Sequence, residues 1–246
     1  MPSIPVDVLR DILEHVDEND DLATLCRVNK IFCSCSQDVL YREIKFEAAH
    51  VIRTLAQSND CARRVRSFKT KQSSPELATA LRNMSSLRIL YCDCIHDASI
   101  LDGCTSKLDS FESSFLHSES LQNFLNSQPS LMHVTLSEDY EPLTPFDEKC
   151  LPNLTRVYAP PSWLSILIPE RPVREVTIFT PSSIDPTDLS FLTLSTTPIQ
   201  KLDIGYDMLF PKPVSLLVST FPSLVHLDVE AHNMDWTVRV PLCLSI

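Results

Sequence analysis

The chain has 246 residues, of which 43% are hydrophobic, and a formal net charge of -11 at pH 7. This composition predicts a folded protein and excludes a wholly disordered one, and the length suits one large domain or a small module followed by a medium-sized one. The acidic charge argues against nucleic acid or an anionic membrane surface as the main partner, because phosphate groups are bound chiefly through Lys and Arg.

Three short apolar helices are predicted in residues 1–45. Pro5 suits the first turn of a helix, where its missing N–H is not needed. The residues that form one wide apolar face on this helix are Val8, Leu9, Ile12, Leu13 and Val16. The apolar groups after the acidic segment 17–21 are Leu22, Leu25, Cys26 and Val28, and then Phe32, Val39, Leu40, Tyr41 and Ile44. So small a segment has more apolar surface than it can bury alone, which predicts an association partner.

This segment resembles an F-box over roughly residues 3–45. The family opens with Leu-Pro-x-Glu/Asp-apolar-Leu-x-x-Ile-Leu, and residues 4–13 read Ile-Pro-Val-Asp-Val-Leu-Arg-Asp-Ile-Leu. Val28, Lys30 and Phe32 match its later Val-x-Arg/Lys and aromatic positions, and residues 40–44 match its end. Two departures, Ile4 in place of the commoner Leu and Phe32 in place of Trp, keep an apolar side chain. The alternative is an ordinary helical bundle within a globular domain.

The resemblance implies a partner and a division of the chain. An F-box docks on a Skp-type adaptor protein, which bridges to a cullin scaffold, and residues 1–45 would form this module. Residues 46–60 are expected to be a helical linker. The residues that the resemblance assigns to adaptor binding are Ile4, Pro5, Val8, Leu9, Ile12, Leu13, Leu25, Val28, Phe32 and Leu40.

A small basic run follows the linker in this acidic chain. Its residues are Arg63, Arg64, Arg66, Lys69 and Lys71. Such runs are most often solvated faces, so we expect no nucleic-acid site here.

A short apolar pattern recurs eight times after residue 60. The eight copies begin, 19 to 26 residues apart, at Val65, Leu87, Leu108, Leu131, Leu154, Val173, Ile199 and Leu224. Helix starts are predicted between copies at Ser74-Pro75, Ser118, Pro161 and Asp185-Pro186. Each copy therefore predicts a strand followed by a helix. Neither element can bury its apolar side alone, so the copies are expected to stack.

The copies resemble, in degenerate form, the leucine-rich repeats that often follow an F-box. Regular repeats place Asn or Cys after the strand, where this chain has Asp93, Ser137 and Pro160. The predicted fold class is mixed α/β: a small N-terminal three-helix F-box, then an irregular leucine-rich-repeat-like solenoid of about eight units with a parallel sheet over residues 61–246. We expect an incomplete C-terminal cap, because residues 231–246 hold no clear capping helix. The alternative is an α/β domain whose parallel sheet closes in a different way.

Side chains between the apolar strand positions are predicted to lie on a concave face, because strand side chains alternate. A mixture of charged and aromatic residues suits protein recognition. The candidate substrate-binding residues are Tyr91, His133, Arg156, Tyr158 and Phe179. The rest of the predicted face is Glu112, Thr135, Glu175, Thr177, Lys201, Asp203, His226, Asp228 and Glu230. For any single one of them the alternative is an ordinary solvated sheet surface.

The sequence predicts no metal, no cofactor and no membrane span. Nine cysteines lack the separated pairs that zinc requires, since the clusters at residues 33–35 and 92–96 have no second pair. We expect free thiols in a reducing compartment, the cytoplasm or nucleus. No apolar run reaches the roughly 18 residues of a membrane helix.

Catalytic patterns are absent from the sequence. Two glycines cannot furnish a Gly-rich phosphate loop, and there is no His-Glu-x-x-His or Gly-x-Ser-x-Gly pattern. The expected function is a non-catalytic substrate-recognition adaptor of a Skp–cullin–F-box ubiquitin ligase. The alternatives are a leucine-rich-repeat scaffold that acts outside a ubiquitin ligase, and an enzyme with a Cys–His pair built on Cys94 or Cys150.

Overall fold

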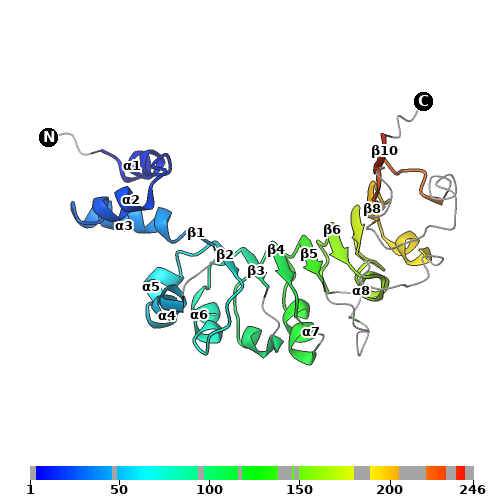
Figure 1. Cartoon of the computed structure of the whole chain (residues 1–246), viewed down its shortest axis with the longest axis horizontal. Coiled ribbons are helices and arrows are strands. Elements are labelled where there is room, and N and C mark those ends of the chain that lie inside the picture. The colour runs from blue at the N-terminus through cyan, green and yellow to red at the C-terminus, as the bar shows by residue number, and fades with distance from the viewer. Residues whose placement is uncertain are drawn as a thin grey trace. The chain divides into compact units, whose positions relative to one another are not determined.

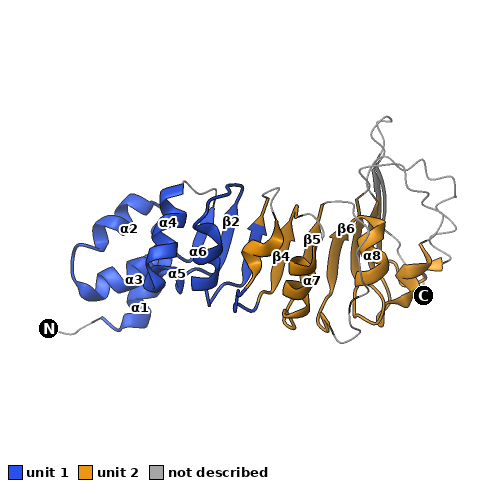
Figure 2. Cartoon of the chain, turned by 90° about the horizontal axis from the view of Figure 1, so that it is seen from below, with its two compact units in different colours: residues 1–91, 103–107 blue, residues 92–102, 108–246 orange. Residues whose placement is uncertain are grey.

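The computed structural model of the chain describes residues 4–45, 49–93, 97–115, 118–137, 146, 150–179, 189–204, 220–230 and 237–241. The chain divides into two compact units, the first made of residues 1–91 and 103–107 and the second of residues 92–102 and 108–246 (Figure 2). Among the helices in these ranges, none combines the length and the apolar character needed to cross a bilayer.

The helices are short. The α-helices are α1 (Val6–Leu13), α2 (Asn19–Leu25), α3 (Lys30–Leu40), α4 (Ala49–Gln57), α5 (Asn59–Ala62), α6 (Leu77–Asn83), α7 (Glu119–Asn126) and α8 (Pro161–Leu167). Two 3-10 helices are η1 (Ala98–Leu101) and η2 (Ser190–Leu194). Residues 46–60, predicted as a helical linker, include α4, whose Ile52 and Leu55 are buried and which packs against α6. Of the predicted helix starts, Asp185-Pro186 lies outside the described residues.

Short strands alternate with these helices. They are β1 (Glu43–Lys45), β2 (Ser67–Thr70), β3 (Ile89–Cys92), β4 (Ser110–Ser113), β5 (His133–Leu136), β6 (Arg156–Ala159), β7 (Glu175–Ile178), β8 (Lys201–Ile204), β9 (His226–Glu230) and β10 (Thr237–Pro241). In each unit the strands lie side by side in chain order, β1-β2-β3 in the first and β4 through β10 in the second. The described pairings among β1 to β9 are parallel, and β10 pairs antiparallel with β9. The predicted α/β class and parallel sheet are therefore confirmed.

The three N-terminal helices enclose a small core of their own. Leu9, Leu13, Leu22 and Cys35 are buried together, and the side chains that pack half-buried around them are Val16, Leu25, Phe32, Val39 and Leu40. Asn29 caps α3. Its side-chain oxygen accepts hydrogen bonds from the N–H groups of Ile31 and Phe32, at 2.9 and 3.0 Å. One face of α1 thus packs inward on α3, and its other face remains in solvent.

A row of buried side chains runs across the strands of the second unit. Alternate residues of each strand are buried, as the period of two requires. The buried row, in register from β4 to β9, is Phe111, Val134, Val157, Val176, Leu202 and Leu227. Helices α7 and α8 lie along one side of these strands (Figure 1), so the opposite face carries the alternate, polar residues. Full burial of each such Val or Leu contributes about 1.5–3 kcal/mol.

Buried and half-buried polar side chains bind backbone groups of other segments. In the first unit, the Asn83 side-chain amide donates to the carbonyls of Leu55 and Ala56, at 3.1 and 2.9 Å. In the second unit, the Gln128 side-chain oxygen accepts from the N–H of Leu108 at 2.9 Å. These side chains satisfy backbone groups at the strand and helix ends that would otherwise be buried without partners.

Arg171 is also buried, with only 2% of its surface exposed, and the burial of a cation is costly unless its N–H groups find acceptors. Its Nε donates to the carbonyl of Cys150 at 2.9 Å, and its Nη1 donates to the carbonyls of Ile166 and Pro169 at 2.9 and 2.8 Å. Its own carbonyl accepts from the N–H of Thr196 at 3.0 Å. One side chain therefore holds the end of α8 against the segment before β6.

We predict that Arg171→Met lowers the free energy of unfolding by about 3 kcal/mol or more, because three carbonyl groups lose a charged donor inside the protein. Chemical denaturation monitored by circular dichroism measures the change. Arg174→Met, the same substitution at an exposed position, is the control and should cost no more than about 0.5 kcal/mol. Equal losses in the two variants would contradict this role for Arg171.

Candidate functional site

The residues predicted to bind an adaptor fall into two groups in the structure. Leu9 and Leu13 are only 4% and 1% exposed and form the core of the helical segment. Leu25, Phe32 and Leu40 pack half-buried against that core. The ten residues therefore do not form one surface, and Leu9 and Leu13 are placed to hold the fold rather than to touch a partner.

The remaining predicted residues are in solvent. Val8 and Ile12 are 47% and 53% exposed, one turn apart on the outer face of α1, and Pro5 precedes them. Ile4 and Val28 are more exposed still. The sequence argument missed two exposed apolar residues of the same segment, Val6 and Ile31.

Exposed apolar side chains are concentrated in this segment. Of the eleven large hydrophobic side chains that are exposed in the described ranges, six lie between residues 4 and 31. The six are Ile4, Val6, Val8, Ile12, Val28 and Ile31. Single exposed apolar residues need no explanation, but a concentration of them on a short segment is typical of a protein–protein contact. We call these six residues the apolar rim.

Strands β5 to β9 carry two polar rows on the side opposite α7 and α8, and the members of each row lie in register. The first row is His133, Arg156, Glu175, Lys201 and His226. The second row is Thr135, Tyr158, Thr177, Asp203 and Asp228. Opposite charges in these rows are paired: Arg156 Nε lies 3.0 Å from Glu175 Oε2, and Lys201 Nζ lies 2.9 Å from Asp203 Oδ2.

These rows line a shallow hollow of about 270 Å³ that reaches from His133 to Asp203. Beside it the rings of Tyr158 and Phe179 stack, with centroids 5.9 Å apart and planes 27° apart. Four of the five predicted substrate-binding residues are therefore neighbours on β5, β6 and the end of β7. We call the side chains of the two rows with Phe179 the open face.

The fifth predicted residue, Tyr91, belongs to the first unit. There it lies on β3, and Lys69 Nζ sits 3.8 Å from the centre of its ring. Glu112, also predicted for the face, is half-buried on β4. The side chain of Glu230 lies outside the described residues.

Three side chains at β8 and β9 come close enough to share a cation. The ligand atoms of Asp203, His226 and Asp228 lie within 4.8 Å of one another. Asp203 and Asp228 face each other in register, and Lys201 and the hydroxyl of Thr177 already bind the Oδ2 oxygen of Asp203. Lys201 therefore neutralises one of the two carboxylates.

The structure describes one of the two candidate catalytic cysteines. Cys94 lies outside the described residues. Cys150 is half-buried, and its carbonyl accepts the hydrogen bond from Arg171. Cys35 is packed in the N-terminal core, and Cys92 is buried on β3.

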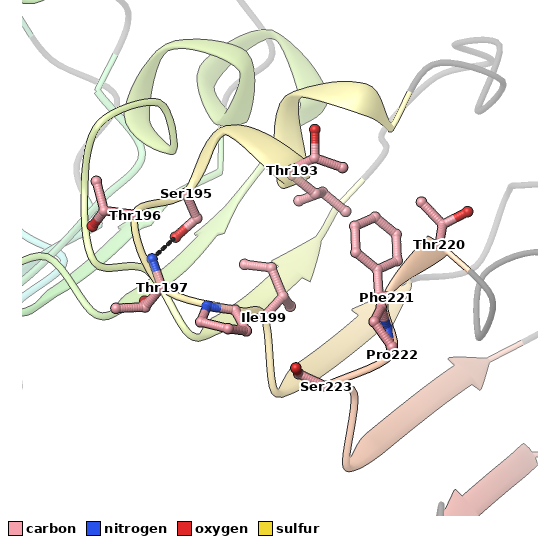
Figure 3. Close-up of a pocket in the computed structure, with 11 residues that line it drawn as sticks. Thr193, Ser195, Thr196, Thr197, Ile199, Thr220, Phe221, Pro222 and Ser223 are labelled. Atoms are coloured by element: carbon pink, nitrogen blue, oxygen red, sulfur yellow. Dashed lines mark hydrogen bonds between the residues drawn. The ribbon is translucent and has the colours of Figure 1, made fainter.

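A second hollow, of about 360 Å³, lies between the segments that precede β8 and β9 (Figure 3). Its described lining combines apolar side chains such as Ile199 and Phe221 with Ser and Thr hydroxyls, and none of these lining residues is titratable. The Ser195 hydroxyl accepts from the N–H of Thr197 at 3.3 Å and donates to the carbonyl of Val173. The Ser195 hydroxyl therefore holds the loop, and the described lining residues include no side-chain acid or base.

No protein-family model matches the chain, and no curated protein is significantly similar to it. A functional assignment therefore depends on the residues and the geometry above.

His133, on the open face, has a pKa shift whose effect on stability can be measured. Burial lowers the pKa of His133 below its ordinary value of 6.5, and the positive charge of Arg156 lowers it further. The unfolded chain binds a proton at this histidine more readily than the folded one does. The stability that neutral His133 provides is thus complete above about pH 6.5 and is lost as the pH falls below it.

We therefore predict that the free energy of unfolding falls less steeply between about pH 7.5 and about pH 5.5 in His133→Gln than in the wild type. Denaturant titrations across this range measure the slope. Arg156→Gln, which removes the charge but keeps the histidine, should give a slope between the two. Identical slopes in all three proteins would show that folding does not lower the pKa of His133.

Proposed function

We propose that the chain is the substrate-recognition subunit of a Skp–cullin–F-box ubiquitin ligase. The observation that carries the proposal is the apolar rim: six exposed apolar side chains on a helical segment that has an F-box-like sequence and a core of its own. Exposed apolar side chains are unfavourable in water, and their burial under a partner is favourable. The proposed partner is a Skp-type adaptor, which connects the chain to a cullin.

We infer further that the strands and helices after residue 60 form a degenerate leucine-rich-repeat array. Three features support this assignment: parallel strands in chain order, one buried row in register, and pattern copies 19 to 26 residues apart. The open face is then the proposed binding surface for a protein substrate. Its paired charges beside the stacked Tyr158 and Phe179 suit a polar protein surface with an aromatic anchor.

In this role the chain performs no chemistry. It holds a substrate near the ubiquitin-charged conjugating enzyme and so raises the effective concentration of one for the other. The proposal places the protein in the cytoplasm or nucleus, with neither nucleic acid nor a membrane as its main partner. The competing proposal, a scaffold outside a ubiquitin ligase, would use the same rim on a different complex.

We predict that the double variant Val8→Glu/Ile12→Glu loses binding to a Skp-type adaptor, by about a hundredfold or more, because two charges would be buried without partners in the contact. Both residues are exposed, so the N-terminal core and the thermal midpoint should be unchanged. Pull-down of the purified adaptor, and detection of cullin in complexes isolated from cells, measure the effect.

The matched control is Leu194→Glu/Val225→Glu, which places two glutamates at exposed apolar positions of the second unit. It should bind adaptor and cullin as the wild type does. Undiminished adaptor binding by the Val8/Ile12 variant would remove the F-box assignment. Complexes that contain the chain and the adaptor but no cullin would favour the scaffold.

A further inference from the structure

A third hollow, which lies in the first unit, is lined almost entirely by arginine. It has a volume of about 330 Å³, and its lining residues are Arg10, Asp38, Arg42, Arg63, Arg64 and Arg66. They come from α1, from α3 and the turn after it, and from the turn between α5 and β2. We propose that this arginine hollow is a binding site for a phosphoryl group, carried either by a free anion or by a phosphorylated side chain.

The carboxylates near the hollow do not neutralise it. Arg64 and Arg10 share Asp38, whose Oδ2 lies 3.5 Å from Arg10 Nη2. Arg42 Nη2 binds Glu14 Oε1 at 2.6 Å, and Arg10 also approaches the exposed Asp7. Five guanidinium groups thus face three carboxylates, which leaves two positive charges in excess.

The excess belongs to two particular residues. In the described part of the chain, neither Arg63 nor Arg66 pairs with a carboxylate. Arg66 is held by a hydrogen bond from Nη1 to the carbonyl of Ser86 at 3.1 Å, and Arg63 is exposed at the hollow. Guanidinium groups held close together repel one another, and an anion between them removes that repulsion.

One hydrogen-bond donor of a lining residue also lacks an acceptor. Arg64 donates from Nη1 to Asp38 and to the carbonyl of Ser34 at 3.2 Å. Its Nε is buried, and among the described residues it has no hydrogen-bond partner. A buried donor without an acceptor is costly, so the described protein groups do not fully satisfy the guanidinium of Arg64.

The chemistry of the lining favours phosphoryl over carboxylate. A phosphoryl group brings up to two negative charges and three acceptor oxygens, which match two uncompensated charges and several planar N–H forks. A single carboxylate would leave one charge unpaired. An extended nucleic acid would meet the acidic remainder of a chain whose net charge is -11.

Folding, rather than the basic run itself, creates the site. Arg63, Arg64 and Arg66 belong to the run that was expected to be a solvated face, and Arg10 and Arg42 join them from distant sequence positions. Lys69, by contrast, lies over Tyr91. None of the arginines belongs to the predicted adaptor-binding set, so the inference does not rest on the proposed ligase function.

The test uses the full chain and two probes, inorganic tripolyphosphate and a short Gly/Ser peptide with one phosphoserine, in calorimetric titrations at constant ionic strength. The test variant is Arg63→Gln/Arg66→Gln, which leaves the hydrogen bonds of Arg64 in place. We expect the wild type to bind at least one probe saturably, and the variant to bind it about tenfold more weakly or worse. Binding to the Skp-type adaptor should be unchanged in the variant.

Arg53→Gln/Arg174→Gln is the control for net charge, because it removes two exposed arginines outside the hollow. It should retain the wild-type affinity. Binding of tripolyphosphate alone identifies a free anion, and binding of the phosphorylated but not the unphosphorylated peptide identifies a phosphorylated side chain. The site is overturned if neither probe binds, if the control loses as much affinity as the test variant, or if a single-stranded oligonucleotide displaces the probes and binds more tightly.

Discussion

The structure depends on the burial of alternate strand residues against neighbouring strands and the helices that follow them. A four-residue strand with two buried side chains has no core of its own, so each copy of the pattern becomes stable only when the next copy covers it. The row that includes Val134, Val157 and Val176 shows this constraint, because every member lies in register with the next and is almost completely buried. The backbone ends that this arrangement buries need donors and acceptors, which Gln128 and Arg171 supply.

The same constraint decides which surfaces are free to bind. Since α7 and α8 cover one side of the strands, the polar rows are left on the other side, where Arg156 and Glu175 pair in solvent. In the N-terminal segment α3 covers only one face of α1, so Val8 and Ile12 stay exposed while Leu9 and Leu13 are buried. The proposed adaptor contact and the proposed substrate contact are therefore formed by side chains that the cores leave exposed.

The sequence predicts the fold class well because periods of two and of about 22 residues are visible in it, and the parallel strands and the buried row follow from those periods. It separates buried from exposed residues of α1 poorly, since the apolar stripe is wider than the face that α3 covers. It does not predict the arginine hollow, because Arg10 and Arg42 join the basic run only after folding. Arg171 also gives no signal in the sequence, because a buried arginine is rare and its partners are backbone carbonyls.

The central claim is that the outer face of α1 is a docking surface for a Skp-type adaptor. Hydrogen–deuterium exchange of the full chain, with and without the purified adaptor, tests it directly, since burial under a partner slows the exchange of the amides it covers. We expect slower exchange in peptides that span residues 4–16, with β5 to β7 unchanged. Unchanged exchange across α1 in the presence of saturating adaptor would contradict the account.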